Sequence, residues 1–316
     1  MAAADINFDA LSNELESTLK KANVKDFPRP KEVVEFPSSN TPIDCFTVLT
    51  EKRILSAPVY DAESKEYIGF VDLRDLVSYV INAEKSIEFS HNSLKDIIAY
   101  VPKVAKVDVT LSYLARRHRF HRVSIDATLL DVARALASSK THRVPVFEND
   151  KIVNIISQST IIAFLAKSLK DMPNVTGANL GKLKIGSSPV IQCSASTPAR
   201  NAFEILENTG RFGMAVTGEG NTIITQTSAH DLKLWLRNPS SEMLGLPIIQ
   251  FLQRIRSQDL DIQVPVLSCS EKDSLGMVLL KLQATRAHRI YVLDAQFHPK
   301  FVVSLSDVLR LLIHKE

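Results

Sequence analysis

The sequence predicts an α+β fold built from four copies of one β-α-β-β-α repeat. Pairs of short apolar runs joined by a polar loop, which are typical of a β-hairpin, recur four times along the 316 residues. Each hairpin is preceded and followed by a segment with helical apolar spacing. In every copy the residue that opens the first helix lies 17 positions before the middle of the first hairpin strand, from Thr41, Thr128, Thr197 and Ser274 to Pro58, Pro145, Met214 and Tyr291.

The last repeat shows the parts of the unit most clearly. His288 and Arg289 lead into an apolar run at 290–293, and a second apolar run follows a polar loop at 301–303. Ser304 with Asp307 three residues later is a capping-box pattern that opens a final helix. Because the other copies keep this order, the sequence indicates an internal repeat of about 70 to 85 residues.

One helix is predicted ahead of the repeats. Phe8, Leu11, Leu15 and Leu19 share a helical face, and we expect this face to pack on the domain behind it rather than on a membrane surface. Prolines at positions 28, 30 and 37 then predict an extended connector.

The first three repeats follow the plan of the last. Thr41 followed by proline is an N-cap with proline at the first helical position. Two connectors separate repeats: 80–120, with the basic cluster Arg116, Arg117, His118, Arg119, His121 and Arg122, and 243–255, which predicts one amphipathic helix. The basic cluster is interpreted as a solvated loop, with a phosphate or an acidic partner helix as the alternative.

The predicted hairpin and helix positions are as follows: strands at 57–60 and 68–71 and a helix opening at 72–75; a strand at 144–147 and a helix opening at 157–160; a strand at 214–216 and a helix opening at 228–231. The predicted boundaries are 1–25 for the N-terminal helix, 26–85 for repeat 1, 86–170 for a connector and repeat 2, 171–240 for repeat 3, and 241–316 for a connector helix and repeat 4.

Composition narrows the class of protein. Hydrophobic residues at 45% and charged residues at 23% are ordinary for a soluble globular chain, and a net charge of +3 gives no argument for nucleic acid. Cys45, Cys193 and Cys269 lie far apart without a CxxC pair, which favours free thiols in a reducing compartment over a disulfide frame or a zinc site. No apolar run approaches the roughly 18 residues of a membrane span, and early Asp5 and Asp9 argue against a secretory signal. We expect the cytoplasm or the nucleus, with no membrane and no nucleic acid as partner.

Three stretches carry a resemblance to a known family. They are HRVPVF (142–147) with IISQS (155–159), HRIYVLD (288–294) with VVSLSD (302–307), and SAPVYD (56–61) with GFVDLRD (69–75). The unit resembles the cystathionine beta-synthase (CBS) domain, a small regulatory module that occurs in pairs. Four such modules, with the LPIIQFLQRIR stretch (246–256) and the VSLSDVL ending, resemble the gamma subunit of the AMP-activated (SNF1-type) protein kinase.

The resemblance implies a fold and a ligand class. The modules would form two paired (Bateman) modules in a pseudo-symmetric disk, and clefts between paired modules would bind AMP, ADP or ATP as regulatory ligands. An aspartate at the start of each second helix would accept the ribose hydroxyls, since a carboxylate takes two hydrogen bonds. By position these aspartates are Asp75, Asp231 and Asp307, and Thr160 replaces the aspartate in repeat 2, which predicts an empty or altered site there.

The phosphate contacts implied by the resemblance come from two sets. The first is the serine three residues before each ribose position, Ser157, Ser228 and Ser304, at a helix N-terminus that favours anions. The second is the basic pair before the first strand: His142, Arg143, His288, Arg289 and, in the register counted above, Arg211. Repeat 1 departs from both sets, with Asp72, which would repel phosphate, and Leu55-Ser56; Lys52 and Arg53 are candidate substitutes. The resemblance also implies a glycine in the second strand of each repeat. It is present only in repeat 1, as Gly69, and is replaced by Asn154, Thr225 and Phe301 in the other repeats.

Three classes of function remain to be compared. A nucleotide-sensing regulatory subunit, with kinase catalytic (alpha) and scaffold (beta) subunits as partners, is favoured by the aspartates and the His-Arg pairs. A ligand-blind scaffold that holds partner subunits is favoured by Leu55, Asp72 and Thr160. An enzyme is disfavoured, because the sequence has no GxGxxG, no GxxxxGK[ST], no metal-ligand cluster and no nucleophile with its base.

Overall fold

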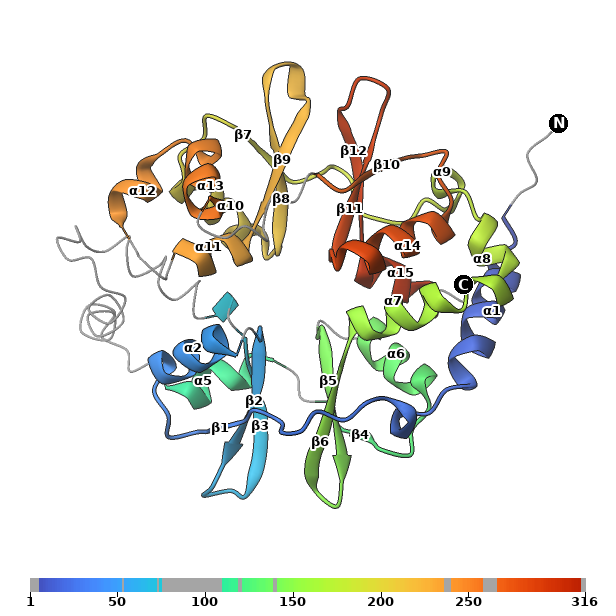
Figure 1. Ribbon diagram of the computed structural model, residues 1–316, viewed down its shortest axis with the longest axis vertical. Helices are drawn as coiled ribbons and strands as arrows, with labels where there is room; N and C mark the ends of the chain where they lie inside the picture. The colour runs from blue at the N-terminus through green and yellow to red at the C-terminus, as the bar shows by residue number, and fades with distance from the viewer. Residues whose placement is uncertain are drawn as a thin grey trace. The chain divides into compact units, whose positions relative to one another are not determined.

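The computed structural model describes residues 6–52, 54–72, 74–75, 110–118, 121–138, 141–235, 240–257 and 266–313 (Figure 1). The chain divides into two compact units, each assembled from separate stretches of sequence. Unit 1 comprises Met1–Val33, Arg119–Val190 and Leu267–Glu316, and unit 2 comprises Val34–His118 and Ile191–Val266. Unit 1 therefore holds repeats 2 and 4, and unit 2 holds repeats 1 and 3. The predicted disk concerns the relation of the two units and stays a prediction, as do the domain boundaries.

Unit 1 begins with helix α1 (Phe8–Lys20) and a 3-10 turn (Val24–Asp26). Repeat 2 consists of β4 (Val123–Ser124), α6 (Leu129–Ser138), β5 (Arg143–Glu148), β6 (Lys151–Ser157) and α7 (Gln158–Lys167). Short helices follow: Leu169–Asp171, α8 (Pro173–Gly177) and α9 (Leu180–Leu183). Repeat 4 consists of β10 (Ser268–Ser270), α14 (Leu275–Thr285), β11 (Arg289–Leu293), β12 (Pro299–Ser304) and α15 (Leu305–Arg310).

Unit 2 holds the other two repeats. Repeat 1 has β1 (Phe36–Pro37), α2 (Pro42–Glu51), β2 (Ser56–Asp61) and β3 (Glu66–Asp72), and α5 (Leu111–Arg116) packs on β3. Repeat 3 has β7 (Gln192–Ser194), α10 (Ala199–Thr209), β8 (Gly213–Thr217), a 3-10 turn (Glu219–Asn221), β9 (Ile223–Ser228) and α11 (Ala229–Trp235). Helices α12 (Ser241–Gly245) and α13 (Ile248–Arg256) follow it.

The four sheets of the described residues share one topology. Each has three strands, of which the first pairs in parallel with the second and the second in antiparallel with the third. A bulge interrupts each hairpin at the same place, after Val59, Val146, Val216 and Val292. Those four valines lie opposite Gly69, Asn154, Thr225 and Phe301, the positions compared in the sequence. The α+β class and the repeated unit are therefore confirmed.

The register predicted for repeat 3 is wrong by one residue. Gly213 pairs with Ser228 as Arg143 pairs with Ser157 and Arg289 with Ser304, so Arg211 lies one residue before the position of the basic pairs. The cause is the helix start. Pro198, not the residue before it, is the N-cap of α10, and in each repeat the N-cap follows the same backbone turn. In repeat 1, Thr41 is the N-cap and Pro42 is the first helical residue. In repeat 3 the Thr-Pro pair lies one residue earlier, so that Thr197 ends the turn and Pro198 is the N-cap.

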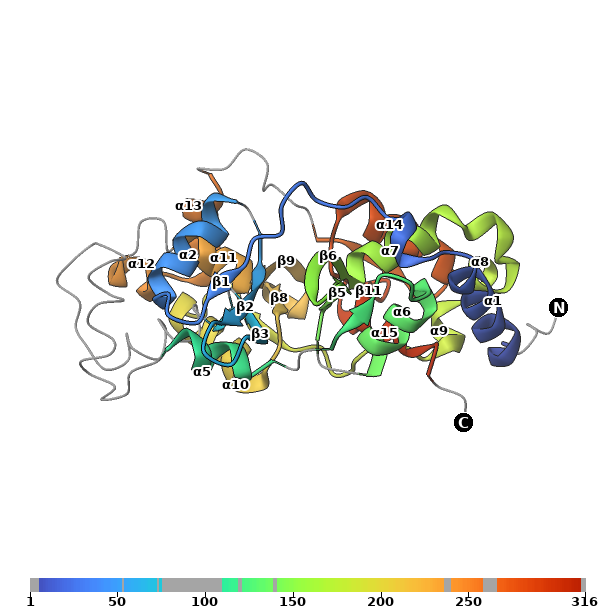
Figure 2. The ribbon, with the colours of Figure 1, turned by 90° about the horizontal axis from the view of Figure 1, so that it is seen from below.

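A shared core joins the two repeats of unit 1. Helix α7 packs on α14 and α6 on α15, while Leu11, Leu15 and Leu19 of α1 are fully buried in the same core. Figures 1 and 2 both show α1 running beside α6 and α8, with which it is in contact. The prediction that the N-terminal helix packs on the domain is confirmed.

The core of unit 2 likewise draws on both of its repeats. Cys45 and Leu49 of α2 lie in one cluster with Phe203 of α10 and Phe251 of α13. The rings of Phe203 and Phe251 meet edge to face with centroids 5.4 Å apart.

Two connector predictions change. The single helix expected at 243–255 is two, α12 and α13, because Pro247 lacks an N–H and holds Leu246 in extended backbone (ψ 152°). The connector at 80–120 ends in α5, a helix capped by Thr110 that the sequence analysis did not predict. Residues 76–109 and Arg119 lie outside the described residues.

Gly69 is required by the packing of α5 on β3. Its φ is +155°, and a Cβ there would lie 2.0 Å from the carbonyl oxygen of Ala115. The equivalent Asn154 has room for a side chain, which donates to the carbonyl of Pro28 at 3.1 Å.

We expect Gly69→Ala to lower the free energy of unfolding by about 1–3 kcal/mol, or more if α5 detaches. Chemical denaturation measures the loss, and Gly177→Ala, where a Cβ meets nothing within 4 Å, is the control. Equal stability of the two variants would contradict this packing.

Candidate ligand-binding site

Three buried carboxylates occupy one position of the repeat. Asp75, Asp231 and Asp307 each lie three residues after the last residue of the second hairpin strand, where the chain turns into the second helix. They are 2%, 3% and 8% exposed. Thr160 has the same place in repeat 2. An ionised carboxylate is costly to bury without partners, so the bonds to each one decide what it can do.

A helix cap uses one oxygen of Asp307. Its Oδ2 accepts from the backbone N–H of Ser304 at 2.8 Å and from the hydroxyl of Ser304 at 2.6 Å. Thr160 completes the same capping box with Ser157 through a neutral hydroxyl. The cap therefore requires an acceptor but not a charge, and it leaves the second oxygen of the carboxylate for another partner.

Cationic side chains meet the remaining oxygens. Arg310 donates to Oδ1 of Asp307 at 3.0 Å, and Arg256 contacts Oδ1 of Asp231 through two nitrogens at 2.9 Å each. Asp75 pairs with Nε2 of His118 and, at 3.6 Å, with Arg117. None of these partners was assigned to a carboxylate in the sequence analysis. Only Arg310 could have been found, since a basic residue three positions on shares a helix face with Asp307.

The structure brings the basic pairs of unit 1 to the same junctions. The backbone carbonyls of His142 and His288 accept from the first N–H of α7 and α15 at 3.0 and 3.2 Å. Arg143 and Arg289, both half-buried, lie opposite Ser157 and Ser304. In repeat 4 the four predicted residues His288, Arg289, Ser304 and Asp307 thus belong to one junction.

The other junctions are less complete. In repeat 3, Ser228 and Asp231 are together, but Phe212 and Gly213 stand at the positions of the basic pair and Arg211 is exposed. In repeat 1, Asp72 caps the backbone N–H of Arg74 at 2.8 Å. Ser56, at the position of the arginines, has a buried hydroxyl without a hydrogen-bond partner.

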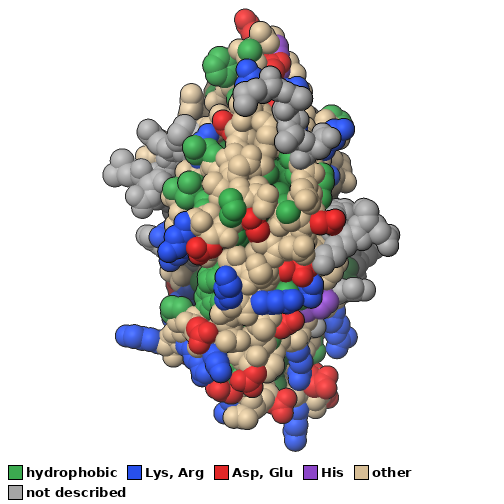
Figure 3. Space-filling view, turned by 90° about the vertical axis from the view of Figure 1, so that its right-hand side faces the viewer, with side chains coloured by type: hydrophobic (Ala, Val, Ile, Leu, Met, Phe, Trp, Pro, Cys, Tyr) green, Lys and Arg blue, Asp and Glu red, His purple; other side chains and the backbone are tan. Residues whose placement is uncertain are grey.

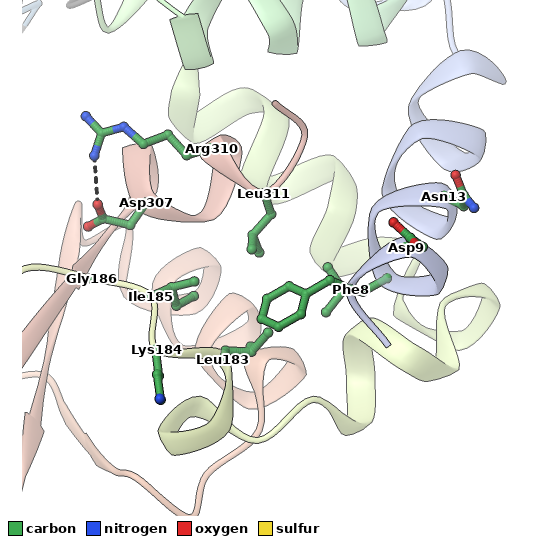
Figure 4. A pocket seen from close by; sticks show the side chains of 11 residues that line it. Phe8, Asp9, Asn13, Leu183, Lys184, Ile185, Gly186, Asp307, Arg310 and Leu311 are labelled. Atoms are coloured by element: carbon green, nitrogen blue, oxygen red, sulfur yellow. Dashed lines mark hydrogen bonds and ion pairs between the residues drawn. The ribbon is translucent and has the colours of Figure 1, made fainter. Parts of the chain in front are cut away.

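Asp307 and Arg310 line a groove of about 940 Å³ in unit 1. Figure 4 shows them on one side and Phe8 of α1 on the other, with Ile185 and Leu311 between. A concave, partly apolar wall with a few polar groups is the usual form of a small-molecule site. The wall given by α1 was missed in the sequence, because Phe8 was assigned only to a packing face.

Metal binding and membrane insertion were also considered for the described residues. No group of three or more His, Cys, Asp or Glu among them could hold a metal ion, and no helix of this part of the chain is long and apolar enough to cross a membrane. Acidic and basic side chains are interspersed on the face in Figure 3, in keeping with the net charge of +3. The cysteines are free, as predicted, and the structure shows that they are buried. Burial raises the pKa of the thiols of Cys45, Cys193 and Cys269 to about 12, about 11 and about 12.

A comparison with known families bears on repeats 1 and 2. The CBS domain family matches residues 24–82 and 113–167. A protein of Methanocaldococcus jannaschii described as an archaeal homologue of the AMPK gamma subunit has the same fold, with a TM-score of 0.66 over 92% of this chain and 99% of that one at 13% identity. Residues 24–82 and 113–167 of this chain are thus similar to CBS domains.

The relatives of the chain are of two kinds, kinase gamma subunits and SDS23 proteins. The chain is 25% identical over 279 residues to the 5'-AMP-activated protein kinase subunit gamma of Dictyostelium discoideum and 21% identical over 277 residues to that of Kluyveromyces lactis, each match covering 85% of this chain. It is 24% identical over 306 residues to the protein SDS23 of Candida albicans, covering 87% of this chain. The matches span 47%, 81% and 48% of these relatives, about half of two of them. The chain resembles the gamma subunit of this kinase, as predicted.

The thiols provide a test of the packing around the repeats. At pH 8 only roughly one in 10³ to 10⁴ thiols with such raised pKa values is a thiolate, the form that reacts. We expect Ellman's reagent to label the native protein slowly and to label three thiols at once in guanidinium chloride. The native rate should rise about tenfold per pH unit, because the thiolate fraction does. Rapid, complete labelling of the native chain at pH 8 would contradict the burial of these cysteines.

Proposed function

We propose that this chain is a non-catalytic regulatory subunit that binds adenine nucleotides and regulates a protein kinase complex in response to energy charge. AMP, ADP and ATP would be regulatory ligands rather than cofactors of a reaction. One observation carries the proposal: the repeat holds a buried carboxylate in three copies at a position where a neutral threonine makes the same helix cap.

The cap does not explain the negative charge at these positions, because a neutral hydroxyl makes the same cap in repeat 2. A carboxylate oxygen left over after capping matches the two hydroxyl donors of a ribose, since hydrogen bonds to an ionised acceptor are stronger than neutral ones. The free N–H groups of the helix beside it favour a phosphate.

Repeat 4 supports the proposal most fully. Ser304 and Asp307 are at the junction, His288 precedes the neighbouring strand and Arg289 begins it, and Asp307 lines the groove of unit 1. The apolar side chains of Ile185, Leu311 and Phe8 in that groove suit the face of a base.

The regulatory role and the partners rest on the relatives. Three similar proteins carry the name of a kinase gamma subunit, so kinase catalytic and scaffold subunits of alpha and beta type are the proposed partners. The proposed compartments are the cytoplasm and the nucleus. The alternative, a scaffold without ligand, is favoured by Thr160 in repeat 2 and by the occupied carboxylate of repeat 3. It is an outcome of the test below.

Isothermal titration of the purified chain with AMP and with ATP tests the ligand. We expect binding in the micromolar range, and we expect Asp307→Asn to weaken it at least tenfold, because the amide cannot accept a ribose bond as an anion does. Asp131→Asn is a matched control: Asp131 caps α6 through Thr128 at 2.9 and 2.6 Å, but it is exposed and belongs to the first helix of its repeat. It should bind as the wild type does.

Two results would oppose the proposal. A wild-type chain that binds neither nucleotide up to millimolar concentration would favour the scaffold. Nucleotide hydrolysis by the pure chain would overturn the non-catalytic assignment.

Co-purification tests the partner. Tagged chain expressed with kinase catalytic and scaffold subunits should recover both in stoichiometric amounts. Recovery of the tagged chain alone would remove the kinase from the proposal and leave nucleotide binding untouched.

A further inference from the structure

We propose that Arg256 is a built-in competitor for ligand: it closes the carboxylate of repeat 3, so that nucleotide binds at Asp307 and not at Asp231. This inference rests on the proposed function, since it states which of the equivalent carboxylates is available. Arg256 is the last residue of α13, a helix outside the repeat that holds Asp231.

All three nitrogens of the Arg256 guanidinium group contact repeat 3. Its Nε and one terminal nitrogen each lie 2.9 Å from Oδ1 of Asp231. The same terminal nitrogen donates to the carbonyl of Gln226 at 2.8 Å, and the other donates to the hydroxyl of Thr225 at 3.3 Å. The side chain is 16% exposed.

Asp231 is equally satisfied. Its Oδ2 accepts from the backbone N–H of Ser228 at 2.8 Å and from the hydroxyl of Thr227 at 3.2 Å, while Oδ1 holds Arg256. The oxygen that a ribose would need is the one that Arg256 covers. Two guanidinium donors on one carboxylate oxygen stand where the two ribose hydroxyls would bind.

The carboxylate of Asp307 is covered more loosely than that of Asp231. Arg310, which meets Asp307, is 51% exposed and lies one helical turn away on the same surface. Because Arg310 is half-exposed, water screens its ion pair with the buried carboxylate, and this pair is easier to break than the one made by Arg256. Asp75 has two partners: Nε2 of His118 and, at 3.6 Å, Arg117, whose side chain is 45% exposed. Of these arginines, Arg256 is the most buried.

Displacing Arg256 is unfavourable for a physical reason. Ribose hydroxyls are neutral, so a ribose that took Asp231 would leave a buried guanidinium group without its counter-ion. At Asp307 the displaced Arg310 turns into solvent and remains able to meet the phosphate. The ligand therefore selects Asp307.

Equilibrium titration with AMP, read as the number of sites per chain, tests the inference. We expect Asp231→Asn to leave the wild-type stoichiometry unchanged. We expect Arg256→Met to add one site per chain, and Arg256→Met with Asp231→Asn to remove the added site. Arg254→Met is the matched control, because Arg254 lies on the same helix and is exposed. It should keep the wild-type number.

A second variant protects the test against misfolding, since Arg256→Met leaves Asp231 buried without its cation. Arg256→Lys keeps a positive charge but cannot form the fork. It should fold, as circular dichroism would report, and should bind AMP at the added site more weakly than Arg256→Met does.

The outcomes separate the inference from the proposed function. A wild-type chain that loses a site on Asp231→Asn, or folded Arg256 variants that add none, would overturn the closed site and leave binding at Asp307 intact. A wild type without AMP binding, beside an Arg256→Met variant that binds one AMP through Asp231, would support the closed site and overturn the proposed function. No binding by any of these chains would overturn both.

Discussion

The helix cap at the end of the hairpin is the interaction on which the rest of the structure depends. In repeats 2, 3 and 4 a serine ends the second strand and begins the second helix, and the side chain three positions later, Thr160, Asp231 or Asp307, accepts from the backbone N–H of that serine. In the same three repeats the carbonyl ahead of the first strand accepts from the first helical N–H, so the start of the hairpin is held against its end. In repeat 4 these bonds bring a basic pair, a serine and an acidic side chain to one junction.

Much of this could be predicted from the sequence, because the parts of each junction follow local rules. Ser304 and Asp307 are three residues apart, and hairpin register follows from turn chemistry and alternation. The repeats and their order needed no structure. The register predicted for repeat 3 was wrong by one residue, because Thr197 and Pro198 were both acceptable N-cap positions. Only the backbone turn before them decides between the two.

What the sequence could not supply are contacts between distant elements. Arg256 lies 25 residues after Asp231, on a helix with its own apolar face, and nothing local distinguishes it from Arg254. His118 is 43 residues from Asp75. The grouping of repeat 2 with repeat 4 also depends on which helical faces fit together, and four similar faces satisfy the same apolar pattern.

Arg256 has a role in charge balance that does not depend on a ligand, because it neutralises the buried Asp231. In unit 1 the starts of α7 and α15 are neighbours, since Gln158 donates to Ser306 at 3.0 Å, and one of the two junctions carries Asp307 while the other carries the neutral Thr160. In unit 2 the junction of repeat 1 lies beside repeat 3, with Arg74 over the ring of Phe212 at 4.4 Å.

Both junctions of unit 2 carry a buried carboxylate. Two like charges in one unit are unfavourable unless each has its own cation. Arg256 and the pair of Arg117 and His118 meet that need within the chain. Unit 1 has only one such charge, because Thr160 stands at the position in repeat 2. Its one carboxylate at this position, Asp307, pairs with the exposed Arg310. The difference between the closed and the available carboxylate thus follows from how many charges each unit buries.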